Sequence, residues 1–111
     1  MSVNTPQESY LPTATLKAWG FTSSWSGAPT LIKSNNIASA VAGTSTPNRY
    51  LDITFTTAMA SANYLVKITN EMADNSSSRG QAFVTTKTTA GFRLLVNQTR
   101  YANAIHFEVM E

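Results

Sequence analysis

The residues that could support catalysis are few and widely spaced in this chain. His106 is the only histidine, so a catalytic triad would have a single candidate base. It alternates with Ile105 and Phe107, and the opposite face of such a strand is typical of a surface or interface residue. Carboxylates that cleave glycosidic bonds stand roughly 5 to 10 Å apart. The candidates by residue type alone are Asp52, Glu71, Asp74, Glu108 and Glu111. We therefore predict that the protein is not an enzyme and has no catalytic residues.

The segment NEMADNSSS, residues 70–78, offers the largest group of oxygen ligands for a metal ion. It lacks the glycine and the closing glutamate of a calcium loop, so a solvated polar loop is the better interpretation. The chain contains no cysteine, which excludes disulfides and zinc–thiolate sites. We therefore expect no metal and no cofactor.

Sugar binding fits the residues better than catalysis does. A glycan site needs an exposed aromatic side chain, with groups around it that bind hydroxyls. The best candidates for that aromatic side chain are Trp25, in SSWSG, and Tyr101, in NQTRYAN; Trp25 could instead cap the core, and Tyr101 could lie at its edge. The residues predicted to surround them are Asn75, Arg79, Asn97, Arg100 and Asn103.

The segments that must position these residues alternate in the manner of β-strands. Apolar residues take every second place in YLDITF and again in NYLVKIT, and the plain run TAMASAN joins the two. Similar short segments, separated by turn residues, recur along the chain, and 111 residues fit one domain. We predict an all-β fold, a small antiparallel β-sandwich of about six to eight strands over residues 14–111. Residues 1–13 are expected to be a lead-in segment or the end of a preceding region.

Composition narrows the choice of partners. Only 13% of the residues are charged, whereas serine and threonine make up about a quarter. The 42% of apolar residues indicates a folded chain rather than a disordered one. Its eight basic residues are scattered singly, without the basic stripe that nucleic-acid binding needs. No apolar run is long enough to span a membrane, and residues 1–13 lack the apolar core of a signal peptide. We expect neither a nucleic-acid partner nor membrane insertion.

Several predicted strands carry apolar residues on both faces. A sandwich buries one face of each sheet, so a second apolar face needs a second cover, and another copy of the chain is the simplest one. The alternative is that these are isolated exposed apolar side chains, which are common. We predict an oligomer. Its candidate interface residues are Trp19, Phe21, Leu65, Leu95 and Met110.

Four segments resemble the C-terminal domain of bacteriophage tail fibre and tail spike proteins. They are LKAWGF, GAPTLIKSNNIASAVAG, YLDITFTTAMASANYLV and TTAGFRLLV, and the resemblance runs from residue 16 to about residue 109. The most specific element is ITFTTAMASANY, in which the plain linker is itself a family feature. The chain departs from the family at KAWGF, where KAWVNF is frequent, and in a longer polar segment at residues 70–79.

The resemblance implies a β-sandwich related in shape to the H-type lectins, assembled as a homotrimer at the distal end of a tail fibre on the virion. Such a protein is synthesised in the host cytoplasm and contacts the bacterial surface together with the rest of the fibre. Tip loops vary with the host, so no ligand residues carry over from the family.

Three functions follow from these observations. The favoured one is a receptor-binding domain that attaches to a bacterial surface polysaccharide (capsule, lipopolysaccharide or teichoic acid) without cleaving it. The first alternative is a C-terminal trimerisation or capping domain, with receptor binding or depolymerase activity upstream. The second is a free-standing cellular lectin of the same fold. A receptor tip should leave Trp25 or Tyr101 exposed, whereas a cap would bury them.

Overall fold

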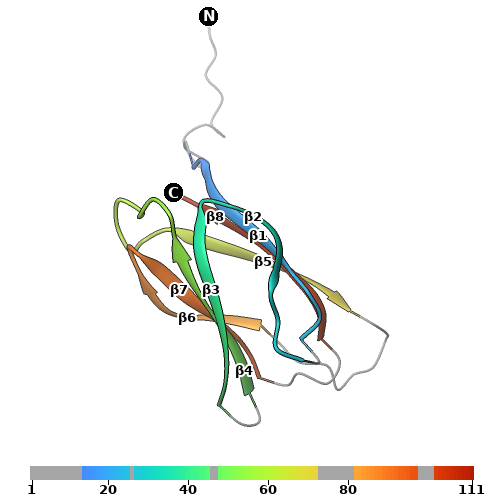
Figure 1. The fold of residues 1–111 in the computed structure, drawn as a ribbon. Coiled ribbons are helices and arrows are strands. Elements are labelled where there is room, and N and C mark those ends of the chain that lie inside the picture. Colours follow the sequence, from blue (N-terminus) through green and yellow to red (C-terminus); the bar gives the residue numbers. More distant parts are fainter. Residues whose placement is uncertain (1–13, 26, 46–47, 73–81, 98–101) are drawn as a thin grey trace, which may run out of the picture.

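The computed structural model describes residues 14–25, 27–45, 48–72, 82–97 and 102–111 as a β-sandwich (Figure 1). All regular secondary structure in these ranges is antiparallel β-strand, which confirms the predicted all-β class. The lead-in predicted at residues 1–13 lies outside the described residues. The strands are β1 (Leu16–Thr22), β2 (Leu31–Asn35), β3 (Ile37–Ser45), β4 (Asn48–Phe55), β5 (Leu65–Met72), β6 (Ala82–Thr88), β7 (Gly91–Val96) and β8 (Ala102–Met110).

The strands form two four-stranded sheets. Sheet A has the order β2-β1-β8-β5, and sheet B has the order β3-β4-β7-β6. Successive side chains of a strand point to opposite faces, so every second residue of the central strands enters the space between the sheets. The buried core consists of Ala18, Trp25, Leu51, Ile53, Phe55, Met59, Tyr64, Phe92, Leu94, Val96, Ile105, Phe107 and Val109.

Four aromatic side chains tie the two sheets together. Phe55 and Phe92 come from sheet B, Phe107 comes from sheet A, and Tyr64 directly precedes β5. Their rings contact one another in series, with centroids 5.4 to 6.5 Å apart. The contacts of Phe55 with Tyr64 and of Phe92 with Phe107 are edge-to-face, the arrangement that ring quadrupoles favour.

The plain linker between β4 and β5 crosses from sheet B to sheet A and is held through its backbone. Asn36, in the turn between β2 and β3, accepts a hydrogen bond from Thr57 N–H (2.7 Å). Its amide donates to the carbonyl oxygens of Lys17 and Thr57, at 3.2 Å each. Further along, the carboxylate of Glu111 accepts bonds from two linker N–H groups, at 2.8 and 3.2 Å. The linker therefore needs few side chains of its own to take one path.

Tyr64 ends this linker and fastens it to the hairpin of β6 and β7. Its hydroxyl lies 2.7 Å from the carbonyl oxygen of Thr88 and 2.8 Å from that of Gly91. Lys87 donates from its Nζ to the carbonyl oxygen of Tyr64 (2.6 Å). Burial raises the pKa of Tyr64 to about 12, although its bond to Thr88 acts in the opposite direction. At neutral pH the phenol is therefore protonated and can donate to these carbonyls.

The strand directions give the sandwich two different ends. All odd-numbered strands end, and all even-numbered strands begin, at what we call the loop end (lower part of Figure 1). The opposite end, called the linker end, carries the β4–β5 linker, the β6–β7 turn and the last residue, Glu111. The two ends present different candidate sites.

Candidate functional site

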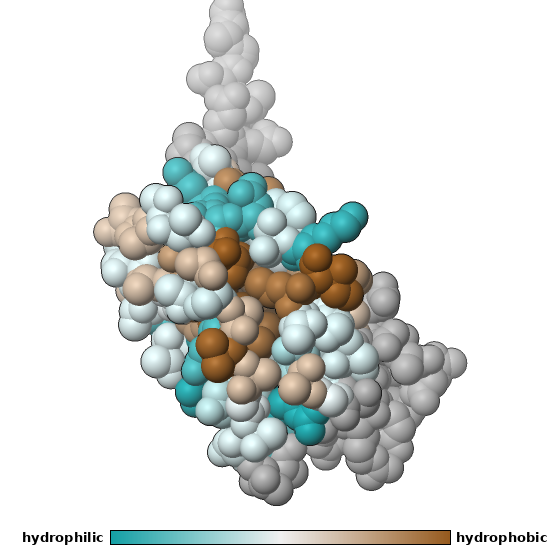
Figure 2. Space-filling model, viewed as in Figure 1, coloured by the Kyte–Doolittle hydropathy of each residue, from teal (hydrophilic) through white to brown (hydrophobic). Residues whose placement is uncertain are grey.

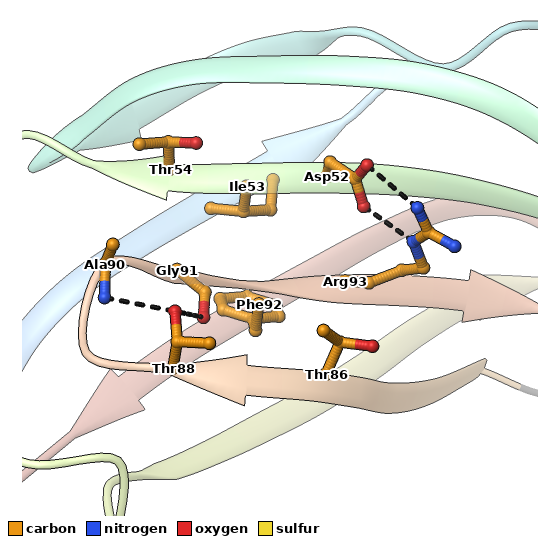
Figure 3. Close-up of a pocket in the computed structure, with 9 residues that line it drawn as sticks. All are labelled: Asp52, Ile53, Thr54, Thr86, Thr88, Ala90, Gly91, Phe92 and Arg93. Atoms are coloured by element: carbon orange, nitrogen blue, oxygen red, sulfur yellow. Dashed lines mark hydrogen bonds and ion pairs between the residues drawn. The ribbon is translucent and has the colours of Figure 1, made fainter.

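A hollow of about 310 Å³ opens on the outer face of sheet B, close to the linker end (Figure 3). It lies where β4, β7 and the β6–β7 turn meet, and polar side chains surround it. We call it the sheet-B hollow. Its lining residues are Asp52, Ile53, Thr54, Thr86, Thr88, Ala90, Gly91, Phe92 and Arg93.

The charged groups of this hollow form one rigid pair. Asp52 and Arg93 lie opposite each other in the pairing of β4 with β7. Arg93 donates from Nε and Nη2 to the two carboxylate oxygens of Asp52, at 2.7 and 3.1 Å. This bond raises the pKa of Arg93 above its usual value, so the guanidinium keeps its charge. The guanidinium carbon also lies 3.7 Å from the centroid of the Tyr50 ring. A fork held on two sides presents its remaining donors in a fixed direction.

Three threonines supply hydroxyl groups around the charged pair. Thr86 lies where the register of β6 with β7 is irregular and has a φ of 51°. This left-handed conformation is rare for a β-branched residue, and bulges of this kind redirect side chains. Thr88 accepts a bond from Ala90 N–H (3.2 Å) and donates to the Gly91 carbonyl (3.3 Å). With Thr54 they add groups that can both donate and accept.

Gly91 sets the floor of the hollow. A Cβ atom at this position would collide with the carbonyl oxygen of Ile53 on the neighbouring strand. Only glycine therefore permits β7 to approach β4 this closely, beside the Asp52–Arg93 pair. Among the described residues, no exposed aromatic ring lines the hollow, because Phe92 belongs to the core. The geometry suits the hydroxyls of a ligand better than its apolar faces.

Trp25, predicted as the leading aromatic platform for a sugar, is fully buried, so that prediction is wrong. Its Nε1–H donates to Thr22 Oγ1 (2.8 Å), which also accepts from Ile105 N–H (3.0 Å). A tryptophan buries a large apolar surface once its one polar group has a partner, and Thr22 supplies that partner. The second interpretation that the sequence left open, in which Trp25 caps the core, is the observed one.

Two of the other predicted glycan residues, Asn97 and Asn103, belong to the described residues. Asn97 is half-buried directly after β7. Asn103 belongs to β8, but its side chain is outside the described part of the structure. Met72 pairs with Ala102 in sheet A, and Ala82 pairs with Val96 in sheet B. The ends of β5 and β7 and the starts of β6 and β8 therefore lie at the loop end. Four candidates lie outside the described residues, namely Asn75, Arg79, Arg100 and Tyr101.

Arg49 is a residue of the loop end that sequence reasoning did not single out. Its Nη1 donates to the carbonyl oxygen of Trp25 (3.4 Å), while its Nε is buried and finds no acceptor among the described residues. A second hollow, of about 220 Å³, lies beside it on the edge of sheet B. We call this the Arg49 hollow. Its lining residues are Ala28, Ala42, Gly43, Thr44 and Arg49.

The predicted interface residues divide between the two outer faces. Trp19 and Phe21 on β1, Leu65 on β5 and Met110 on β8 alternate with core residues and so lie on the outer face of sheet A. Leu65 is 61% exposed and pairs with Met110. Leu95 instead lies on the outer face of sheet B. One continuous surface can therefore hold only four of the five.

The structure also exposes apolar residues that the sequence analysis did not name. Ile32 on β2 and Val41 on β3 are 57% and 61% exposed, and Phe83 on β6 is exposed as well. Figure 2 shows apolar surface, in brown, over and between the edge strands β2 and β3. The apolar outer surface is thus wider than the alternation of single strands indicated.

The Asp52–Arg93 pair was also missed. Alternation within YLDITF and FRLLV predicts that both residues point outward, but nothing local predicts that they meet. They come together because β4 pairs with β7, across the intervening β5 and β6. Recognising the pair required the order of strands in sheet B.

The described ranges contain no group of three or more potential metal ligands and no helix long and apolar enough to cross a membrane. Comparisons with family models, with curated proteins and with solved structures found no match to the chain. The proposed function therefore rests on the geometry of the sheet-B hollow and on the sequence resemblance.

Proposed function

We propose that this domain attaches a bacteriophage tail fibre to a bacterial surface polysaccharide and binds the polysaccharide without cleaving it. The observation that carries the proposal is the sheet-B hollow, in which one rigid Asp52–Arg93 pair and three threonine hydroxyls converge. The resemblance of the sequence to tail fibre tips supports the same function.

The donors and acceptors of the hollow match the chemistry of a sugar. Each sugar hydroxyl both donates and accepts, so it is recognised best by paired acceptors and donors held side by side. Asp52 offers its remaining carboxylate lone pairs, and Arg93 offers the guanidinium N–H groups that Asp52 does not use. Their side chains are 43% and 36% exposed, so a ligand can reach both.

Binding without cleavage follows from the number of carboxylates. Hydrolysis of a glycosidic bond ordinarily uses two carboxyl groups on either side of that bond. Asp52 is the one carboxylate among the residues that line the hollow, and both of its oxygens accept bonds from Arg93. The described lining of the hollow thus supports binding of a sugar rather than its hydrolysis.

A trimer at the distal end of the fibre would compensate for weak individual sites. Three linked sites raise the effective affinity without any new contact, because the second and third binding events become intramolecular. The outer face of sheet A, with Trp19, Phe21, Leu65 and Met110, is the candidate interface. It would leave the outer face of sheet B, and so the hollow, open to the polysaccharide.

Staining of intact bacteria with the fluorescently labelled domain, before and after periodate oxidation of surface sugars, tests the function. We expect selective staining of some strains, abolished by periodate. The polysaccharide of a stained strain then supplies oligosaccharide for affinity measurements. Absence of staining on every strain, together with no binding to isolated capsule, lipopolysaccharide or teichoic acid, would overturn the proposal.

The site itself is tested by Asp52→Asn. This change keeps the shape of the side chain but removes the charge that holds Arg93. We expect the affinity for one oligosaccharide repeat to fall by about tenfold or more, since a hydrogen bond to a charged group contributes about 1.5 to 3 kcal/mol. The free energy of unfolding should change by about 1 kcal/mol or less, as for other exposed ion pairs.

The matched control is Glu108→Gln, the same chemical change on the outer face of sheet A. It should leave the affinity for the oligosaccharide unchanged, because a single repeat bound to one site involves no avidity. Equal losses in both variants would place the sugar elsewhere on the molecule.

A second candidate function is a trimerisation cap. The burial of Trp25 favours it, because a cap was expected to bury the aromatic residues that a receptor tip exposes. The half-exposed Trp19 and Phe21 on sheet A fit an assembly surface equally well. A trimer that stains no strain and binds no isolated polysaccharide would select this function over the first.

A further inference from the structure

We propose that the Arg49 hollow binds an anionic group, a carboxylate or a phosphate, at a site separate from the sheet-B hollow. Arg49 is the second residue of β4, at the loop end, whereas Gly91 and Thr54 of the sheet-B hollow lie at the opposite ends of the same paired strands. The inference therefore does not depend on the proposed sugar site.

The Arg49 guanidinium is incompletely hydrogen-bonded by the described residues. Its Nε–H is buried and has no acceptor among the described residues, and its Nη1 makes one long bond of 3.4 Å to the Trp25 carbonyl. A buried donor without a partner costs about 1 to 3 kcal/mol, and native proteins rarely leave one. An arginine cannot lose its proton to avoid this cost. An external acceptor would satisfy the donor.

The described carboxylates all lie away from Arg49 or have other partners. Among the described residues, the one ion pair joins Arg93 to Asp52 on the outer face of sheet B. Glu111 lies at the linker end, where it binds N–H groups of the β4–β5 linker. Glu108 belongs to sheet A, where it pairs with Trp19 and Lys67 across the strands. None of these described carboxylates pairs with Arg49.

The Arg49 hollow has room for an anionic group. The wall of the hollow consists of small residues: Ala28 from the β1–β2 loop, and Ala42, Gly43 and Thr44 from the edge strand β3. Gly43 itself is paired with Tyr50, whose ring leaves no room for a Cβ atom on the outer face of the sheet. About 220 Å³ accommodates a phosphate or a carboxylate together with part of the molecule that carries it.

The guanidinium of Arg49 is positioned by the β1–β2 loop. The buried Trp25 anchors the β1–β2 loop through its bond to Thr22, and its carbonyl holds Arg49 from one side. A guanidinium presents parallel N–H groups that match the two oxygens of a carboxylate or phosphate. Arg49, whose Nε–H has no acceptor among the described residues, is therefore suited to an anion rather than to a neutral sugar.

The experiment is a nuclear magnetic resonance titration of the arginine Nε–H signals in the full chain at constant ionic strength. The probes are inorganic phosphate and glucuronate, with glucose as the neutral control. We expect a saturable shift of the Arg49 signal with at least one anion and none with glucose. In the phosphate titration the Arg93 signal is an internal control, because its Nε–H already binds Asp52 and should hardly move.

The two anions distinguish the source of the ligand chemistry. A response to phosphate alone indicates a phosphate group, and a response to glucuronate alone indicates an acidic sugar. A linear shift without saturation, or no shift of Arg49 with either anion, would overturn the proposal.

Variants separate this site from the sugar site. Arg49→Gln should weaken the responding anion by about tenfold or more, because it removes a charged donor, whereas Asp52→Asn should leave the anion affinity unchanged. Unchanged anion binding by folded Arg49→Gln contradicts the assignment. Should Arg49→Gln fail to fold, Arg49→Lys replaces it. This variant keeps the charge but loses the parallel N–H groups of the guanidinium, so we expect it to bind the anion more weakly than the unchanged protein does. Failure of the sugar experiments would leave this result standing.

Discussion

Trp25 stabilises the molecule from inside the sandwich rather than from its surface. The bond from its indole to Thr22 joins the β1–β2 loop to β1, and Thr22 in turn accepts from β8. The carbonyl of Trp25 then holds Arg49 of sheet B. One buried residue thus connects a loop, both sheets and a charged group, which explains why an aromatic residue stands in so polar a segment.

Tyr64 makes the stability of the folded protein depend on pH at high pH. The phenol ionises near pH 10 in the unfolded chain but near pH 12 in the folded one, so the unfolded state loses its proton first. The resulting stability is fully present below pH 10 and is lost as the pH rises through about 12. We expect Tyr64→Phe to lower the free energy of unfolding at neutral pH by about 1 to 2 kcal/mol, because the Thr88 and Gly91 carbonyls lose their donor.

Urea unfolding of both proteins between pH 8 and pH 12 checks this prediction. The difference between them should shrink above pH 10 by about 1.4 kcal/mol for each pH unit, and so reach zero and change sign before pH 12. Other titrating groups are common to both proteins and cancel in the difference. A difference that stays constant to pH 12 would show that Tyr64 does not carry a raised pKa.

At the scale of elements, the connections between the sheets are specified by single polar residues. The β4–β5 linker contains mostly small residues, yet Asn36 and Glu111 bind its backbone from outside. Asn36 also has a φ of 61°, a left-handed conformation that asparagine and glycine tolerate best. The turn between β2 and β3 and the linker therefore depend on the same side chain.

Substitution of Asn36 separates its two roles. Asn36→Gly keeps the backbone conformation and loses the side-chain bonds, so we expect a loss of about 1 kcal/mol or more in the free energy of unfolding. Asn36→Ala should lose a further 1 kcal/mol or so, because alanine disfavours positive φ. Thermal unfolding measures both, and the exposed neighbour, in Asn35→Ala, serves as the control. Equal stability of the two Asn36 variants would contradict the backbone contribution.

At the scale of the whole molecule, the two sheets present different outer faces. Sheet A carries two half-exposed aromatic residues, Trp19 and Phe21, beside the aliphatic pair of Leu65 and Met110. Sheet B carries the ion pair and the hollow, close to the linker end. This difference is the basis for placing assembly on one face and ligand binding on the other.

The oligomer is tested by sedimentation equilibrium at micromolar concentration. We expect about three times the chain mass of 12.0 kDa. Phe21→Lys should reduce the mass to that of one chain, because it places a charge in the proposed interface, whereas Val41→Lys, at an exposed site on sheet B, should not. A single-chain mass for the unchanged protein would exclude the trimer, and dissociation by Val41→Lys alone would move the interface to sheet B.

The sequence was sufficient to predict an all-β sandwich of up to eight strands, because the direction of a side chain in a strand depends only on its place in the alternation. Leu51, Ile53 and Phe55 are buried and Asp52 points outward, as that rule requires. The same rule correctly separated Leu65 from the buried face of β5.

The candidate functional surfaces depend on contacts between residues that are distant in the chain, and no local pattern encodes these contacts. Arg93 reaches Asp52 because β7 lies beside β4, and Arg49 gains its hollow because the β1–β2 loop passes the edge of β3. Trp25 is buried because Thr22 offers its indole an acceptor within the core. Strand pairing and loop placement minimise the free energy of the whole chain, so these contacts became visible only in the folded molecule.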